Sequence, residues 1–246
     1  MDKINELIDL FKNMSNNVEP QKIIDLYERK ILDLKNPQLC YCFAKYIQGS
    51  DIKSHEKVIL ESKNLEYVYN FARDIKKSDK LELSNDIVER KDLEYNYKFA
   101  KFIFPCNIKE HEKVILESKD PKYNYMFAKA IKNANIKEHE KVVLESKDPK
   151  YNYMFALGIK DANIKEHEKV ILESKDLEYN YKFAKTIIGA YVLAHSKILL
   201  ENNYELYNEN KKNIDEIDKI LYKNMKMDSD IKKIDKLLLT LQNKNE

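Results

Sequence analysis

Residues 107–120 read NIKEHEKVILESKD. The string returns 28 residues later at residue 135 with one conservative change, and again unchanged at residue 163. Weaker copies start at Asp79, Asp51 and Ile23, and a degenerate copy starts at Tyr191. The chain therefore contains six repeats and a degenerate seventh. Their boundaries are 23–50, 51–78, 79–106, 107–134, 135–162, 163–190 and 191–218.

The first half of each repeat predicts an amphipathic helix. If the positions of a repeat are numbered 1 to 28, positions 2, 5, 8, 9 and 12 fall on one helical face at about 100° per residue. In the fourth repeat these positions are Ile108, His111, Val114, Ile115 and Ser118.

The second half of each repeat predicts another helix. Position 14 is always Asn or Asp, and Pro follows it in three repeats, which is a strong helix-start signal. Positions 17, 21, 24 and 25 share a face, and Gly49, Asn133 and Gly189 are expected to close the turns to the next repeats. Position 21 is Phe throughout: Phe43, Phe71, Phe99, Phe127, Phe155 and Phe183.

A helical pair of this length cannot bury its apolar faces alone, but stacked neighbours can. The pattern resembles the α-solenoid class of helical-hairpin repeats, which includes tetratricopeptide, HEAT and Sel1-like arrays. The unit is shorter than the tetratricopeptide repeat of about 34 residues. The resemblance implies an all-α, right-handed α-solenoid of about seven repeats. Residues 1–22 and 219–246 are expected to form its N- and C-terminal capping helices, and the fold class by itself carries no function.

Composition narrows the class of protein further. The 246 residues include 44 Lys or Arg, 42 Asp or Glu, three Cys and only three Gly, which excludes a Gly-rich phosphate loop. The longest uncharged apolar run, residues 186–194, is too short to span a membrane. Acidic residues within the N-terminal apolar pattern argue against a secretory signal. We therefore expect an intracellular, cytoplasmic protein without membrane partners.

The histidines form the first candidate site. All five occupy position 5, beside Glu in most repeats, as in a metal or proton-relay ladder: His55, His111, His139, His167 and His195. Adjacent helices pack about 8–10 Å apart, whereas zinc requires donors about 2 Å from one centre. Tyr27 and Leu83 take the same position in other repeats, so packing of the ring in the seam between helices is the favoured interpretation.

The cysteines and acids give no sharper chemistry. Cys40 and Cys42 point to different sides of one helix, Cys106 lies in a closing turn, and small buried thiols are expected. The acids recur evenly along the array, whereas an active site needs one constellation. We expect no catalytic residue, metal or cofactor, and therefore no enzyme.

Tyrosine gives a sharper signal at position 19. It lies about 160° from the Phe at position 21, with Lys or Arg of position 23 nearby and Leu157 as the exception. The ring either packs between successive second helices, with Ala at position 22 making room, or forms an exposed Tyr/Lys stripe. The six tyrosines are Tyr41, Tyr69, Tyr97, Tyr125, Tyr153 and Tyr181.

Charge sorts by repeat half. Over the six repeats the second halves sum to +8 and the first halves to −5. Second helices usually line the concave surface of such arrays, so that surface would be basic and lined by Tyr. It could hold an acidic protein segment with Tyr anchors, or a nucleic-acid backbone with stacked bases. About one net charge per repeat is modest for a dedicated nucleic-acid binder.

The leading hypothesis is a non-enzymatic scaffold that binds a protein partner, with a nucleic-acid binder using the same stripe as the alternative. Near-identical repeats 4 to 6 are typical of viral and bacterial arrays that engage host or defence components, and such an array would act in the host cytoplasm. The expected anchors are Tyr69, Tyr97, Tyr125, Tyr153 and Tyr181, and the expected cations are Arg73, Lys101, Lys129 and Lys185.

Overall fold

A computed structural model describes residues 2–14, 21–191, 194–195 and 198–199. These residues contain no β-strand, and thirteen α-helices lie among them in consecutive packed pairs, which confirms the predicted all-α helical-repeat fold. The helices are α1 Asp2–Met14, α2 Gln21–Asp33, α3 Pro37–Tyr46, α4 Ile52–Glu61, α5 Leu65–Asp74, α6 Lys80–Arg90, α7 Leu93–Phe102, α8 Ile108–Ser118, α9 Pro121–Ala130, α10 Ile136–Ser146, α11 Pro149–Gly158, α12 Ile164–Ser174 and α13 Leu177–Thr186.

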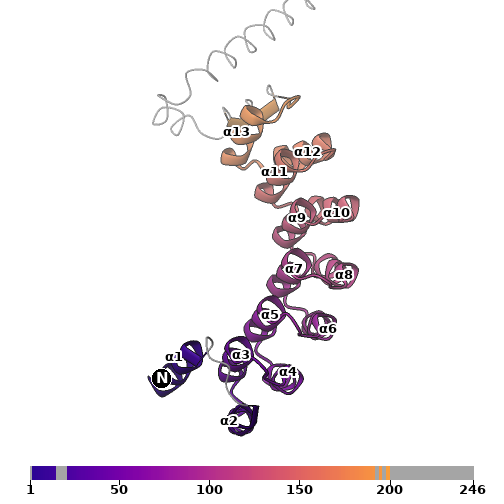
Figure 1. Ribbon diagram of the computed structural model, residues 1–246. Coiled ribbons are helices and arrows are strands. Elements are labelled where there is room, and N and C mark those ends of the chain that lie inside the picture. Colours follow the sequence, from indigo (N-terminus) through magenta and orange to yellow (C-terminus); the bar gives the residue numbers. More distant parts are fainter. Residues whose placement is uncertain (1, 15–20, 192–193, 196–197, 200–246) are drawn as a thin grey trace, which may run out of the picture. The chain divides into compact units, whose positions relative to one another are not determined.

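The chain divides into two compact parts, Met1–Asn135 and Ile136–Glu246. In the first part, α3, α5, α7 and α9 lie side by side as a layer of second helices, and α2, α4, α6 and α8 lie next to them (Figure 1). In the second part, α11 packs on α13 and α10 packs on α12. The expected cap at 219–246 and most of the degenerate repeat 191–218 lie outside the described residues.

Each second helix begins at the predicted Asx cap. The Asn36 side chain accepts the Leu39 N–H at 3.0 Å, and Asp120 accepts the Tyr123 N–H at 3.1 Å. Pro37 follows Asn36 at the first helical position, where a missing N–H costs nothing. The cap residue is in an extended or intermediate conformation, so it stops the preceding turn and starts the next helix.

Left-handed residues occur in the turns after the helices of a repeat. Position 13, always Lys, has a positive φ after each first helix, and the six φ values run from 47° to 57°. Position 27 has a positive φ at Gly49, Asn133, Asp161 and Gly189, so the predicted Gly and Asn turn closures are confirmed. A left-handed residue reverses the chain within one position, which keeps the connections short.

The buried faces differ in part from the predicted ones. In α8, His111, Val114 and Ile115 are buried, but Ile108 and Ser118 are exposed. The Ser118 hydroxyl instead donates to the Ile115 carbonyl at 2.6 Å. In α8 only positions 5, 8 and 9 therefore face inward, whereas position 6 is also buried in the first three repeats, as Glu28, Glu56 and Ser84.

In α9 the predicted Ala130 is exposed, and the buried residues occupy positions 18, 19, 21, 22 and 25. Position 18 is Asn in the last four repeats, and its polar side chain hid it from a hydrophobic pattern. Each of these asparagines is fully buried: Asn96, Asn124, Asn152 and Asn180.

The first helix closes the start of the array. Helix α1 packs against α3, and the rings of Phe11 and Phe43 meet edge to face with centroids 5.3 Å apart. Ile8 and Phe11 are buried, while Ile4 and Leu7 pack partly buried against the same core. The four residues form one apolar face of this helix, as the capping role expected for residues 1–22 requires.

Candidate partner-binding surface

Lys and Tyr one turn apart pair on the second helices. The Lys101 ammonium donates to the Tyr97 hydroxyl at 3.0 Å, and the Lys129 ammonium donates to the Tyr125 hydroxyl at 2.8 Å. Each Nζ also lies 5.3 Å from the centroid of its tyrosine ring. We call these two pairs, Tyr97–Lys101 and Tyr125–Lys129, the Lys–Tyr pairs. Each pair places an ammonium group over the ring of a buried tyrosine.

The tyrosine rings pack between helices instead of standing free. Tyr97 and Tyr125 are only 9% and 5% exposed, and Tyr69, Tyr153 and Tyr181 are half-buried. The Tyr69 ring lies 5.9 Å from Phe99 of the next second helix, and the Tyr153 ring lies 6.5 Å from Phe183. The sequence left two interpretations open, an exposed stripe and packing between successive second helices. In the structure the rings are buried or half-buried, and those of Tyr69 and Tyr153 contact the next second helix.

The four expected cations have different surroundings. Arg73 pairs with its neighbour Asp74 at 2.6 Å, and Lys45 pairs with the same carboxylate at 2.7 Å. These hydrogen bonds, first that of Arg73, hold the pKa of Asp74 well below its usual range. Arg73 is therefore already neutralised within the chain.

Lys101 and Lys129 lack such a neighbour. Both side chains are exposed, and none of the ion pairs found among the described residues includes either of them. Lys185, in the second part, is also exposed and lies 5.6 Å from the Tyr181 ring centroid. These three lysines are the available cations among the residues that the sequence singled out.

An exposed aromatic ring lies beside one of these cations. The third repeat ends with Phe102 and Phe104, which are 57% and 83% exposed. The Lys101 Nζ lies 4.9 Å from the Phe102 ring centroid. The repeat pattern did not single out these rings, although Phe104 stands at repeat position 26, which is Lys in three of the six repeats. Apolar and cationic groups thus meet at the end of α7.

The histidines occupy the seams between repeats, as predicted. All five are fully buried, and rings such as His111 pack on the Phe of the preceding second helix, with centroids 5.7 Å apart for His111 and Phe99. Burial lowers the pKa of His55 and His111 to about 4. Burial also lowers the pKa of His167 and His195, although neighbouring Glu140 and Glu168 act in the opposite direction.

The buried asparagines orient these rings, a role that the hydrophobic pattern did not reveal. Asn96 Nδ2 donates to the Ile87 and Asp92 carbonyls at 3.2 and 2.7 Å, and its Oδ1 lies 2.8 Å from His111 Nδ1. The Ser84 hydroxyl lies 2.8 Å from the other ring nitrogen. The recurrence of Asn three residues before the invariant Phe was the available signal, because a polar residue on a buried face needs partners.

The cysteines and metal-ligating types show no reactive grouping. Cys40 and Cys42 are buried, and burial raises the pKa of the Cys40 thiol to about 12. A thiol of that kind is a poor nucleophile at neutral pH. Across the part of the chain that the structure describes, no three His, Cys, Asp or Glu side chains gather in an arrangement that could hold a metal ion.

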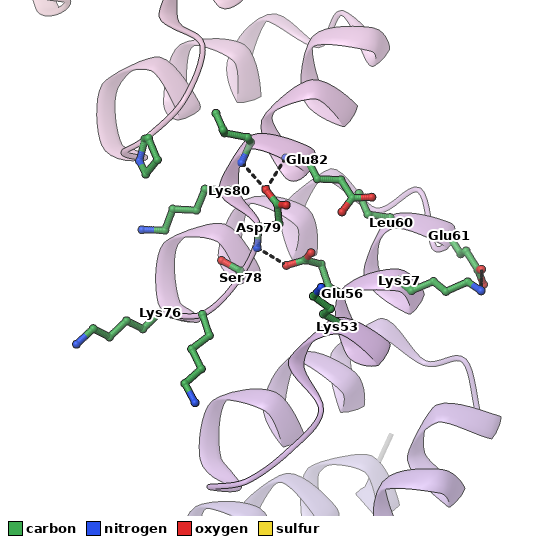
Figure 2. A pocket seen from close by; sticks show the side chains of 13 residues that line it. Lys53, Glu56, Lys57, Leu60, Glu61, Lys76, Ser78, Asp79, Lys80 and Glu82 are labelled. Carbon is green, nitrogen blue, oxygen red and sulfur yellow. Dashed lines mark hydrogen bonds and ion pairs between the residues drawn. The ribbon is translucent and has the colours of Figure 1, made fainter.

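A hollow of about 850 Å³ lies between α4 and α6 (Figure 2). Two of its acids are already engaged: Glu56 accepts the Asp79 N–H at 2.8 Å, and Asp79 caps α6 through the Leu81 and Glu82 N–H groups, each at 3.1 Å. Burial raises the pKa of Glu56. The polar groups therefore close the turn between repeats, and they leave the exposed lysines around the hollow without a shared focus.

Two further findings bear on the chain as a whole. Among the described helices, none is both long enough and apolar enough to cross a membrane. Comparisons with protein-family models, curated proteins and solved structures gave no match to this chain.

Proposed function

We propose that the chain is a non-enzymatic cytoplasmic scaffold that binds an acidic segment of a protein partner on its second-helix layer. The observation that carries the proposal is the state of Lys101 and Lys129. Each exposed ammonium is held by a buried tyrosine hydroxyl and lacks a carboxylate partner among the described residues. A cation already held in place loses less side-chain entropy when it binds a carboxylate.

The surroundings of Lys101 favour a protein over a nucleic acid. Phe102 offers exposed apolar contact area beside the cation, as a polypeptide with mixed acidic and apolar side chains requires. Base stacking requires an accessible ring face. Tyr97 and Tyr125, which the nucleic-acid alternative uses as stacking platforms, do not offer one, because they are almost fully buried. The exposed Phe102 ring could stack a base, so the salt dependence of oligonucleotide binding decides between the two ligands.

The tyrosines therefore have a supporting role in the proposal. Tyr97 and Tyr125 position the lysines, and Lys185 is the corresponding cation of the second part. Arg73 contributes less, because Asp74 already neutralises it. The near-identical repeats 4 to 6 are typical of arrays that engage host or defence components, and a protein of that kind is the proposed partner.

Charge reversal tests the proposal. The probes are a fluorescent peptide that alternates Glu with Phe or Leu, the same peptide with Gln in place of Glu, and single- and double-stranded oligonucleotides. The Lys101→Glu/Lys129→Glu variant should bind the acidic peptide about tenfold more weakly than the natural chain, which corresponds to about 1.4 kcal/mol. Matched changes at exposed Lys109 and Lys113 of α8 should leave its affinity unchanged.

Three results would overturn the proposal. The first is equal affinity for the Glu and Gln peptides. The second is an unchanged affinity in the Lys101→Glu/Lys129→Glu variant. The third is binding of oligonucleotides but not of the peptide, with a steep loss of affinity as salt rises, which would favour the nucleic-acid alternative.

A further inference from the structure

Two buried histidines of the second part lie between an amide and a carboxylate. His167 Nδ1 is 2.8 Å from Asn152 Oδ1, and His167 Nε2 is 3.2 Å from Glu140 Oε1. His195 repeats the arrangement with Asn180 at 2.7 Å and Glu168 at 3.2 Å. Both rings are fully buried, and the Glu140 and Glu168 side chains are 14% and 12% exposed.

The asparagine fixes which ring nitrogen carries hydrogen. Asn152 Nδ2 donates to the Val143 carbonyl at 2.9 Å and to the Asp148 carbonyl at 2.8 Å, which uses both of its hydrogens. A reversed amide would point its oxygen at two carbonyl oxygens, so Oδ1 must face the ring. The His167 Nδ1 atom must then donate to it. Asn180 makes the same pair of bonds, to the Ile171 and Asp176 carbonyls.

This leaves Nε2 facing an acceptor. A neutral ring that carries its hydrogen on Nδ1 presents a lone pair at Nε2, and an ionised Glu140 also presents only lone pairs. Glu140 Oε1 already accepts the backbone N–H of Asn163. An attractive contact between Nε2 and Oε1 at 3.2 Å requires one hydrogen between them. Either the ring is a protonated imidazolium beside an ionised carboxylate, or the ring is neutral beside a protonated carboxyl group. Both forms hold one proton more than a neutral His beside an ionised Glu.

In the first part, two histidines can form their hydrogen bonds as neutral rings without an extra proton. At His111 a serine, Ser84, takes the place of the glutamate, and its hydroxyl can donate to Nε2 of a neutral ring. At His55 a cysteine, Cys40, takes the place of the asparagine, and Nδ1 has no hydrogen-bond partner. A neutral His55 can therefore carry its hydrogen on Nε2 and donate it to Glu28 at 3.0 Å.

We propose that the His167–Glu140 and His195–Glu168 pairs each hold one extra proton at neutral pH, so that the packing of α12 on its neighbours weakens as the pH rises. Among the described residues, the charged groups acting on His167 are Glu140 of α10 and Glu166 of its own helix. The α11 groups that face it, Asn152 and Phe155, carry no charge. At His195 the charged group is Glu168 of α12, and Asn180 and Phe183 of α13 are neutral.

The sign follows from proton counting. Above a pH of about 6.5 an unfolded chain carries neutral His and ionised Glu, so it binds fewer protons than the folded pair. Stability therefore falls as the pH rises, and the opening constant increases about tenfold per pH unit for each pair that opens. Burial lowers the pKa of the His167 ring, but the proton belongs to the pair, because its loss would leave a buried net negative charge.

The test uses the full chain labelled with ¹⁵N in its histidine rings. NMR should show His111 with hydrogen on Nδ1 and a bare Nε2 from about pH 6 to 9. His167 should share a hydrogen at Nε2 and lose it only at alkaline pH. Hydrogen exchange, corrected for the intrinsic rate, should show α12 losing protection from about pH 6.5 upward while that hydrogen is still held, and levelling off once the hydrogen has left, while α8 keeps its protection. These measurements on the natural chain require no variant to fold.

The repeats also supply matched variants. Glu140→Ser copies the natural Ser84 arrangement and should reduce the alkaline loss of α12 protection to the contribution of the remaining His195–Glu168 pair. Ser84→Glu should create the same loss at His111 in α8. A bare Nε2 on His167 at about pH 7, or α12 protection that stays constant between about pH 7 and 9, would overturn the proposal. A Ser84→Glu chain whose α8 protection is independent of pH would do so as well.

Discussion

Replacing Asn96 with Val tests whether the buried asparagines orient the histidine rings. Val is the natural residue at this repeat position in the second repeat, as Val68, so the backbone accommodates it. In the third repeat the change leaves the Ile87 carbonyl and His111 Nδ1 buried without their present partner. At about 1–3 kcal/mol for each unsatisfied group, and with some compensation from apolar packing, we expect a loss of about 3 kcal/mol.

Hydrogen exchange of the full chain measures this loss where it occurs. The opening constants of α7 and α8 should rise about 100-fold, because about 1.4 kcal/mol corresponds to a factor of ten. A double-mutant cycle with His111→Leu, which copies the natural Leu83 of the same repeat position, isolates the contact. In that background Asn96→Val should cost at least about 1.5 kcal/mol less. An equal cost in both backgrounds would refute the orienting role of Asn96.

Three further outcomes follow from the same geometry. Lys147→Gly should stabilise the second part by about 0.5–1 kcal/mol in urea unfolding, because its φ of 54° suits Gly, whereas Lys147→Ala should give no gain. Asp148→Ala removes the cap on the Lys150 N–H at 2.9 Å, so it should cost about 1 kcal/mol and fray the start of α11 in hydrogen exchange. Because burial lowers the pKa of His111 to about 4, the buried neutral ring contributes stability that is fully present above about pH 6.5. This stability is lost as the pH falls toward 4, by up to about 3 kcal/mol. A His111→Leu chain should not show that loss when unfolding is measured as a function of pH.

The helical-pair architecture was predictable because two independent signals repeat every 28 residues. The invariant Phe marks the core, and the Asx at position 14 marks the start of each second helix. Asn96 was missed for the opposite reason. A buried polar residue contributes nothing to a hydrophobic pattern, and its partners are carbonyls whose positions exist only in the folded repeat.

The tyrosines were harder to place because one angle allowed two environments. A second helix contacts its neighbours on two sides, so a ring about 160° from the core Phe still meets the next helix, as Tyr69 meets Phe99. Burial there depends on the rotation between successive repeats, which the period alone does not give. The exposure of Phe104 was also outside the repeat pattern, because a single departure carries no periodic signal.

Packing and binding are therefore different functions of one repeat position. Tyr97 contributes its ring to the contact between second helices and its hydroxyl to Lys101, so the scaffold itself sets the position of the proposed contact cation. A Tyr97→Phe change keeps the ring and removes only the hydroxyl that holds the ammonium. Under this account it should leave unfolding nearly unchanged while weakening the binding of the acidic peptide, whereas a tyrosine that served packing alone would leave both unchanged. Comparison of the two quantities in this one variant thus separates the two functions at a single atom.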